Sequence, residues 1–138
     1  MIKRKATATI HNLSGVFVGR ITQTRAKRIG CKCADIFLTK NYVRHIKLVH
    51  SKELDALGIT VENYVRMIVE HYNEVREGTH NSILLVVRQT GRTTHDAAAI
   101  RLFYDKPHDW WEIKTAEPRS TADLDKRKLL WKKSQPPK

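Results

Sequence analysis

The residues best suited to chemistry are two histidines in the segment 39 to 50. His45 and His50 stand five positions apart, beside an apolar stripe that Tyr42, Ile46 and Val49 form at helical spacing. The pKa of a free histidine lies close to neutrality, so its side chain can both take and give a proton. Helix histidines are more often core or surface residues than catalysts. The pair is therefore either structural or an acid–base site.

A second group of candidates lies in the C-terminal half, where each predicted strand carries a cation or a hydroxyl. They are Arg88 at the end of strand 82–89, Arg101 inside strand 97–104, and Lys114 and Thr115 at the end of strand 110–115. Side chains alternate across a strand. These residues therefore form either the solvated face of a half-buried sheet or a set of charges directed at one phosphate. In the second case they would lie beside an acid–base histidine.

Further cations extend this phosphate-binding hypothesis. Arg92 lies in the turn 90–93, a candidate phosphate cradle, and Arg44 and Lys47 stand on the histidine segment as candidate substrate contacts. Attack of a ribose 2′-hydroxyl on its own phosphate needs a base, an acid and cations to stabilise the developing charge. That reaction needs no metal, and the sequence lacks both clustered carboxylates and a GxxxxGK[ST] loop. We therefore expect no cofactor.

The cysteine inventory consists of Cys31 and Cys33. They are too close in sequence for a routine disulfide and too few for a zinc site, so we expect no metal site and two reduced thiols.

Charge is the unusual feature of the composition. The 138 residues include 26 Lys and Arg against 14 Asp and Glu, a formal net charge of +12. A field of this sign attracts polyanions, of which nucleic acid is the commonest in cells. The most apolar run, SILLVV, is too short to span a membrane, and the N-terminus lacks the apolar core of a secretory signal. We expect a soluble, cytoplasmic protein that binds RNA and no membrane.

Periodicity and turn residues predict the elements that must position these side chains. Strands are expected at 7–10, 16–21 and 35–38, with 24–30 as a cationic connector. Helices are expected at 39–50 after Thr39, from the Thr60 cap through Val75 to the stop at Gly78, and over 123–131 after Ser120. A meander of strands 82–89, 97–104 and 110–115 follows the second helix. This order predicts an α+β fold, with N-terminal helices packed on a curved antiparallel β-sheet and a basic C-terminal tail or helix.

Residues 35–50 place a short strand before a helix that carries HI-x-x-x-H. This segment resembles the entry of the phage-type barnase/EndoU/colicin/RelE-like (BECR) nucleases. The amphipathic second helix, the strands ILLVVR and AIRLFY, and the closing strand ending in Lys114, Thr115 and Ala116 are similar to that family's layout. The resemblance covers roughly residues 15–118. It divides the chain into a basic N-terminal segment (1–14), one nuclease domain (15–118) and a basic tail (119–138).

The resemblance implies a metal-independent endoribonuclease, toxin-like or phage-encoded, that cleaves RNA by 2′-hydroxyl transesterification. It gives the acid–base role to His45 and His50, phosphate binding to Arg88 and Arg101, and the strand-end hydroxyl position to Thr115. A cognate inhibitor or immunity protein would be a further partner. The alternative is a catalytically silent nucleic-acid-binding or protein-interaction module on the same scaffold, since both functions need the positive charge. Which histidine is the base, the RNA substrate and the oligomeric state are left open.

Overall fold

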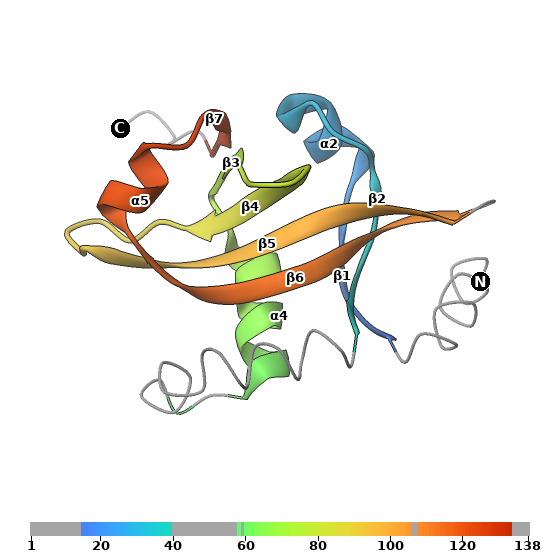
Figure 1. Cartoon of the computed structure of the whole chain (residues 1–138), viewed down its shortest axis with the longest axis horizontal. Coiled ribbons are helices and arrows are strands. Elements are labelled where there is room, and N and C mark those ends of the chain that lie inside the picture. The colour runs from blue at the N-terminus through green and yellow to red at the C-terminus, as the bar shows by residue number, and fades with distance from the viewer. Residues whose placement is uncertain (1–14, 40–57, 59, 106–107, 134–138) are drawn as a thin grey trace.

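The computed structural model describes residues 15–39, 58, 60–105 and 108–133. Within these ranges it contains seven strands and three helices (Figure 1). In chain order they are β1 (Gly15–Ile21), α2 (Gln23–Ile29), β2 (Ala34–Thr39), α4 (Val61–His71), β3 (Glu74–Glu77), β4 (Ser82–Val87), β5 (Thr94–Asp105), β6 (His108–Ser120), α5 (Thr121–Asp125) and β7 (Leu129–Lys132).

The strands form one mixed sheet in the order β1-β2-β6-β5-β4-β3-β7. All neighbours are antiparallel except β2 and β6, which run parallel. The expectation of N-terminal helices packed on an antiparallel sheet was therefore wrong. The described chain is mostly β-sheet, its helices are short, and its first described element is a strand. The expected helix at 39–50 lies outside the described residues apart from Thr39, which ends β2.

Helix α4 provides the core around which the sheet curves. Thr60 caps it, because the Thr60 hydroxyl accepts the Asn63 N–H at 3.2 Å. Tyr64, Val65 and Ile68 are fully buried on one side of the helix, as its apolar stripe predicts. The sheet residues in the same core include Val18, Ile36, Leu85, Ile100 and Ile113. In Figure 1 the helix crosses behind the long β5–β6 ribbon.

The strongly bent sheet brings its two edges toward each other at the C-terminal end of α4. The Arg25 guanidinium of α2 lies 4.1 Å from the centre of the Trp131 ring on β7. Strand β1 also approaches α4 so closely that a Cβ at Gly19 would collide with Val69. These contacts connect the first and the last strand of the sheet order across the end of the helix.

The other face of the sheet does not pack on α4, and we call it the outer face. Its own small core contains Leu84, Val86, Ala97 and Ala99, covered at one end by Leu124 of α5. Most of the remaining positions on this face are polar. Because antiparallel partners point to the same side, the strand register decides which polar residues lie together there.

Three local expectations also need correction. The expected connector at 24–30 is helix α2, in which Thr22 is the N-cap and Gly30 takes the left-handed conformation, with φ 86°. Helix α4 ends at His71, because Val75 belongs to β3 and pairs with Leu85. The last helix is only α5, which Ser120 caps as expected. The residues after it return to the sheet as β7 instead of forming a tail or a longer helix.

Candidate functional site

Only some of the candidate residues can be placed. His45, His50, Arg44 and Lys47 lie outside the described residues. The remaining candidates are described: Arg88, Arg92, Arg101, Lys114 and Thr115. They do not converge on one point, because they lie at different ends of the outer face and its turns.

The Arg88 guanidinium belongs to a cluster of ion pairs near α5. Its Nη2 donates to Glu74 Oε2 at 2.7 Å and to Asp125 Oδ1 at 3.1 Å, and its Nε donates to Glu74 Oε1 at 3.2 Å. Glu74 is buried and also accepts from Arg76. Burial alone would raise the pKa of Glu74, but the hydrogen bonds from Arg88 and Arg76 outweigh it and hold the pKa below its ordinary value. Arg88 therefore anchors β4 to β3 and α5.

The distance to Arg101 confirms that the two arginines are separate. Val87 pairs with Asp96, whereas Arg101 pairs with Ser82 at the other end of β4. At about 3.4 Å per residue, Arg88 and Arg101 lie roughly 20 Å apart along the strands. Arg92 lies farther still from Arg101, in the exposed β4–β5 turn, where its carbonyl accepts from the Thr121 hydroxyl. One phosphate cannot contact all three arginines.

A buried histidine in the same region is structural. His95 Nδ1 accepts the Gln89 N–H at 3.0 Å, so Nε2 carries the proton and donates to Thr121 Oγ1 at 2.8 Å. Burial lowers the pKa of His95, and the nearby Arg88 lowers it further. The ring is therefore neutral, and it joins the β4–β5 turn to the start of α5.

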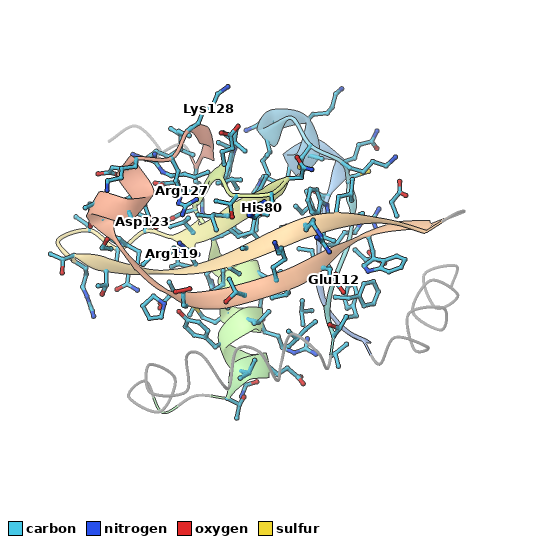
Figure 2. The ribbon with its side chains drawn as sticks, in the orientation of Figure 1. His80, Glu112, Arg119, Asp123, Arg127 and Lys128 are labelled. Atoms are coloured by element: carbon cyan, nitrogen blue, oxygen red, sulfur yellow. The ribbon has the colours of Figure 1, made fainter. Side chains whose placement is uncertain are left out.

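Helix α5 is surrounded by further ion pairs. Asp123 accepts from Arg119 Nη1 at 3.1 Å and from Arg127 Nη2 at 3.5 Å. Burial raises the pKa of Asp123, but these two guanidinium groups more than offset it, so the pKa is lowered. Figure 2 shows Arg119, Asp123 and Arg127 together at this end of the molecule, with Glu112 well apart from them along β6.

Around Arg101 the register builds a different arrangement. Five residues from five adjacent strands lie in one line across the outer face, and we call this line the Arg101 row. In order they are Phe17 on β1, Phe37 on β2, Glu112 on β6, Arg101 on β5 and Ser82 on β4. Two aromatic rings, a carboxyl, a guanidinium and a hydroxyl thus follow one another at the spacing of neighbouring strands, about 4.8 Å.

Arg101 and Glu112 form the polar centre of the row. Arg101 Nη2 lies 4.0 Å from Glu112 Oε1, and the two side chains are 39% and 13% exposed. Burial raises the pKa of Glu112, and the charge of Arg101 offsets only part of this effect. A carboxylate whose pKa is raised is a stronger proton acceptor than an ordinary one. Glu112 is the functional candidate that the sequence analysis missed.

The neighbouring bulge in β6 places a hydroxyl on the same face. Ala99 pairs with Thr115 and Ile100 with Ile113, so Lys114 is the extra residue. Bulges often re-aim side chains next to active sites. Among the described residues, neither the buried Thr115 hydroxyl nor the buried Thr39 hydroxyl at the end of β2 has a hydrogen-bond partner. An unsatisfied buried hydroxyl costs about 1–3 kcal/mol, so two of them beside the row are unusual.

Aromatic side chains form the other end of the row. The Phe17 and Phe37 rings meet edge to face with their centres 5.9 Å apart, and Phe37 packs on Trp110 in the interior. Phe17 is 41% exposed, which is high for such a large apolar side chain. Exposed aromatic rings are the surfaces on which single-stranded nucleic acids stack their bases, and Phe17 lies three strands from Arg101 in the row.

A cavity adjoins Arg101 at the end of β4. It has a volume of about 810 Å³, and its lining includes Lys32, Asn81, Leu102 and Trp111. The thiol of Cys31 also lines it. Burial and the neighbouring Cys33 raise the pKa of Cys31 to about 11, so this thiol is not a nucleophile at neutral pH. Both cysteines are free thiols.

Two further features concern the described part of the chain alone. It has no helix that is both long and apolar enough to cross a membrane. Nor do its His, Cys, Asp and Glu side chains form a group of three or more that could hold a metal ion. Comparison of the chain with protein-family models, curated proteins and solved structures gave no match. The geometry of the outer face is therefore the basis for assigning a function.

Proposed function

We propose that the protein is an endoribonuclease that cleaves RNA by attack of a ribose 2′-hydroxyl on the adjacent phosphate, without a metal ion. The observation that carries the proposal is the Arg101 row. In this row the Glu112 carboxyl and the Arg101 guanidinium lie on neighbouring strands, and the exposed Phe17 ring lies two strands beyond Glu112. The net charge of +12 supports an anionic polymer as the substrate.

Glu112 acts as the general base. Its carboxylate accepts the proton of the 2′-hydroxyl while the 2′-oxygen forms a bond to phosphorus. The bond from phosphorus to the 5′-oxygen then breaks, and that oxygen receives a proton from a general acid. The products are a 2′,3′-cyclic phosphate and a free 5′-hydroxyl, so the step is balanced in atoms and charge.

Arg101 stabilises the phosphorane. A guanidinium can donate two parallel hydrogen bonds to phosphate oxygens, and the charge on those oxygens increases in the transition state. Phe17 stacks on a neighbouring base and sets the position of the chain along the row. The Lys114 ammonium, at the bulge on the next stretch of β6, is a further group for the phosphate, whereas the Thr115 hydroxyl is buried.

The general acid is the remaining role. His45 or His50 is expected to supply the proton to the leaving 5′-oxygen, since each can be protonated near neutral pH. With Glu112 as base, the two histidines no longer need to share both roles. The cognate inhibitor or immunity protein, and a toxin-like or phage-encoded origin, stay predictions from the family resemblance.

A second candidate function is RNA binding without cleavage. The ion pairs of Arg88 with Glu74 and Asp125 favour this candidate, because they leave Arg101 as the one arginine among the described residues of the row. Fewer free guanidinium groups are then available to stabilise a phosphorane. A guanidinium and an aromatic ring can contact the phosphate and the base of an RNA strand without cleaving it. The two candidates make different predictions about the Glu112 carboxyl, which binding does not require.

The test is cleavage of labelled RNA by the full-length chain in the presence of EDTA, with analysis of the ends. Glu112→Gln should lower the rate by roughly 10²- to 10⁴-fold, the usual worth of a general base. Glu62→Gln is the matched control, because Glu62 forms an exposed ion pair with Arg66 on α4 at 3.0 Å. RNA with 2′-O-methyl groups should bind and resist cleavage.

Three outcomes decide between the candidates. Cyclic phosphate ends that depend on Glu112 and not on Glu62 support the proposed reaction. RNA binding with no cleavage of any RNA by the wild-type chain would identify the silent module. Equal cleavage by Glu112→Gln and wild type would remove Glu112 from the mechanism.

A further inference from the structure

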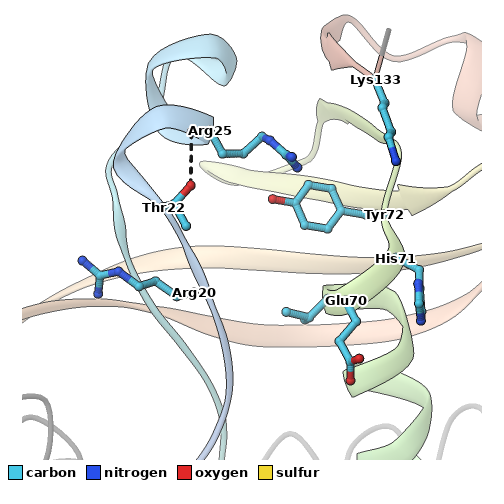
Figure 3. A pocket seen from close by; sticks show the side chains of 8 residues that line it. Arg20, Thr22, Arg25, Glu70, His71, Tyr72 and Lys133 are labelled. Carbon is cyan, nitrogen blue, oxygen red and sulfur yellow. Dashed lines mark hydrogen bonds between the residues drawn. The ribbon is translucent and has the colours of Figure 1, made fainter. Parts of the chain in front are cut away.

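A second polar cavity lies on the opposite side of the sheet from the Arg101 row. It is found where the two sheet edges meet at the C-terminal end of α4, and we call it the seam pocket (Figure 3). Its volume is about 300 Å³, and its polar lining includes Thr22, Arg25, Glu70, His71, Tyr72 and Lys133. The mouths of curved β-structures are common positions for small-molecule sites. No residue of the Arg101 row takes part in it.

Two cations that line the seam pocket, Arg25 and Lys133, have no acidic partner among the described residues. The Arg25 guanidinium instead lies over aromatic rings, 4.1 Å from the centre of Trp131 and 5.4 Å from that of Tyr72. The Arg25 guanidinium also hydrogen-bonds the Tyr72 side chain, and the N–H groups at the edge of a stacked guanidinium can bind an anion. Figure 3 shows Arg25 and Lys133 reaching toward Tyr72 from two different elements.

The other charged groups at the pocket do not cancel this pair. The Arg20 guanidinium is bound to Asp35 at 2.7 Å and points away from Tyr72 in Figure 3. The Glu70 carboxylate points away from Arg25 and Lys133 in the same view. The last carbonyl groups of α4 do carry partial negative charge. The alternative explanation is therefore that Arg25 and Lys133 only compensate the end of the helix.

Tyr72 adds a neutral hydrogen-bond donor. Burial raises its pKa, and the charge of Arg25 offsets only part of that effect, so the phenol keeps its proton. The Thr22 hydroxyl accepts the backbone N–H of Arg25 at 3.3 Å, which leaves its own O–H available as a donor. Two cations and two hydroxyl donors around a small cavity are a donor set suited to phosphate oxygens.

We propose that the seam pocket binds the terminal phosphate of a nucleotide, either a free nucleotide or the phosphorylated 5′-end of an oligonucleotide. Arg25 and Lys133 bind the phosphate oxygens, and Tyr72 donates a further hydrogen bond. A pocket of about 300 Å³ is at the small end of ligand sites and accommodates a phosphate with part of its sugar. This site is independent of the proposed nuclease activity.

The experiment measures binding of adenosine 5′-monophosphate to the full chain by calorimetry, with adenosine as the ligand that lacks the phosphate. Two further arms use a 2′-O-methyl oligonucleotide with and without a 5′-phosphate, which cannot undergo the proposed cleavage. Arg25→Gln and Lys133→Gln remove one charge each from the pocket. Arg66→Gln is the control, because it removes the same charge from the exposed surface of α4.

We expect the nucleotide to bind at least about tenfold more tightly than adenosine, and each pocket variant to weaken it by about 10- to 100-fold. Arg66→Gln should change the affinity by less than about twofold. A preference for the 5′-phosphorylated oligonucleotide over the nucleotide would identify a chain end as the ligand, and the reverse would identify a free nucleotide. If Arg25→Gln does not fold by circular dichroism, Lys133→Gln decides.

Three results would overturn the site. They are equal binding of nucleotide and adenosine, equal loss in Arg66→Gln and Lys133→Gln, and no saturable binding of any phosphate ligand. The second result would mean that the affinity comes from net charge alone. The third would mean that the two cations serve only the end of α4.

Discussion

Arg88→Met should destabilise the protein, whereas Arg101→Met should leave its stability almost unchanged. Arg88 makes two hydrogen bonds to the buried Glu74, and its own side chain is 21% exposed. Breaking a buried ion pair costs about 3–5 kcal/mol. The lower end, about 3 kcal/mol, applies because Arg76 still neutralises Glu74. Arg101 is 39% exposed and 4.0 Å from its partner, so its removal should cost at most about 1 kcal/mol.

The assay is thermal unfolding of both variants beside wild type, followed by RNA cleavage per folded molecule. A loss of about 3 kcal/mol should lower the melting temperature by roughly 10 °C in a chain of this size. Arg101→Met should lower cleavage by roughly 10²- to 10³-fold, as expected for one lost transition-state donor. A stable Arg88→Met variant that no longer cleaves RNA would refute the reasoning, because Arg88 would then contact the phosphate.

Three further predictions concern single side chains. Ile68→Ala should lower the free energy of unfolding by about 2–5 kcal/mol in denaturant titrations, because Ile68 is fully buried in the core around α4. Glu112→Gln should stabilise the protein at neutral pH but not in acid. Folding raises the pKa of Glu112, so wild type loses stability as pH rises from the ordinary glutamate pKa through the raised one; parallel curves of melting temperature against pH would contradict this. Cys31, with a pKa of about 11, should react with a thiol reagent at neutral pH roughly 100-fold more slowly than an ordinary cysteine, as followed by mass spectrometry.

Local signals predicted most of the elements that the structure describes. The Thr60 cap and the stripe through Tyr64 and Ile68 gave α4, and the apolar run at 82–89 gave β4. Helix α2 was missed although its cap residues are present, because its basic surface was interpreted as a connector. The basic residues of α2 therefore led to a wrong interpretation, although its cap residues Thr22 and Gly30 indicate a helix.

The pairing of distant segments could not be predicted in the same way. Nothing local shows that β2 pairs in parallel with β6, or that the apolar residues at 129–132 form a strand against β3 rather than a helix. Those residues take their conformation from the partner that they meet, because an edge strand satisfies backbone groups that a helix would leave unpaired on β3. The predicted fold class was wrong for this reason.

In the candidate site, too, single residues could be predicted from the sequence but their partners on other strands could not. Arg101 was identified from the sequence, but its partner Glu112 was not, because the pair depends on the exact register of the β5–β6 hairpin. The pairing of Asp105 with His108 fixes that register. If the sequence interpretation had paired Asp105 with His108, it would also have placed Arg101 opposite Glu112. The commitment of Arg88 to Glu74 depends on β3, which was predicted as the end of a helix.

The parallel junction between β2 and β6 has a consequence for how the protein folds. Its two paired positions, Ile36 with Trp111 and Phe37 with Glu112, join the β1–β2 pair to the C-terminal strands across about half of the chain. Contacts of such high sequence separation form late, because a long loop must close before they can contribute. The hairpin of β1 and β2 should therefore be a separate cooperative unit that opens first in native-state hydrogen exchange. Because this unit brings Phe17 and Phe37 to Glu112, the Arg101 row is complete only in the fully folded chain.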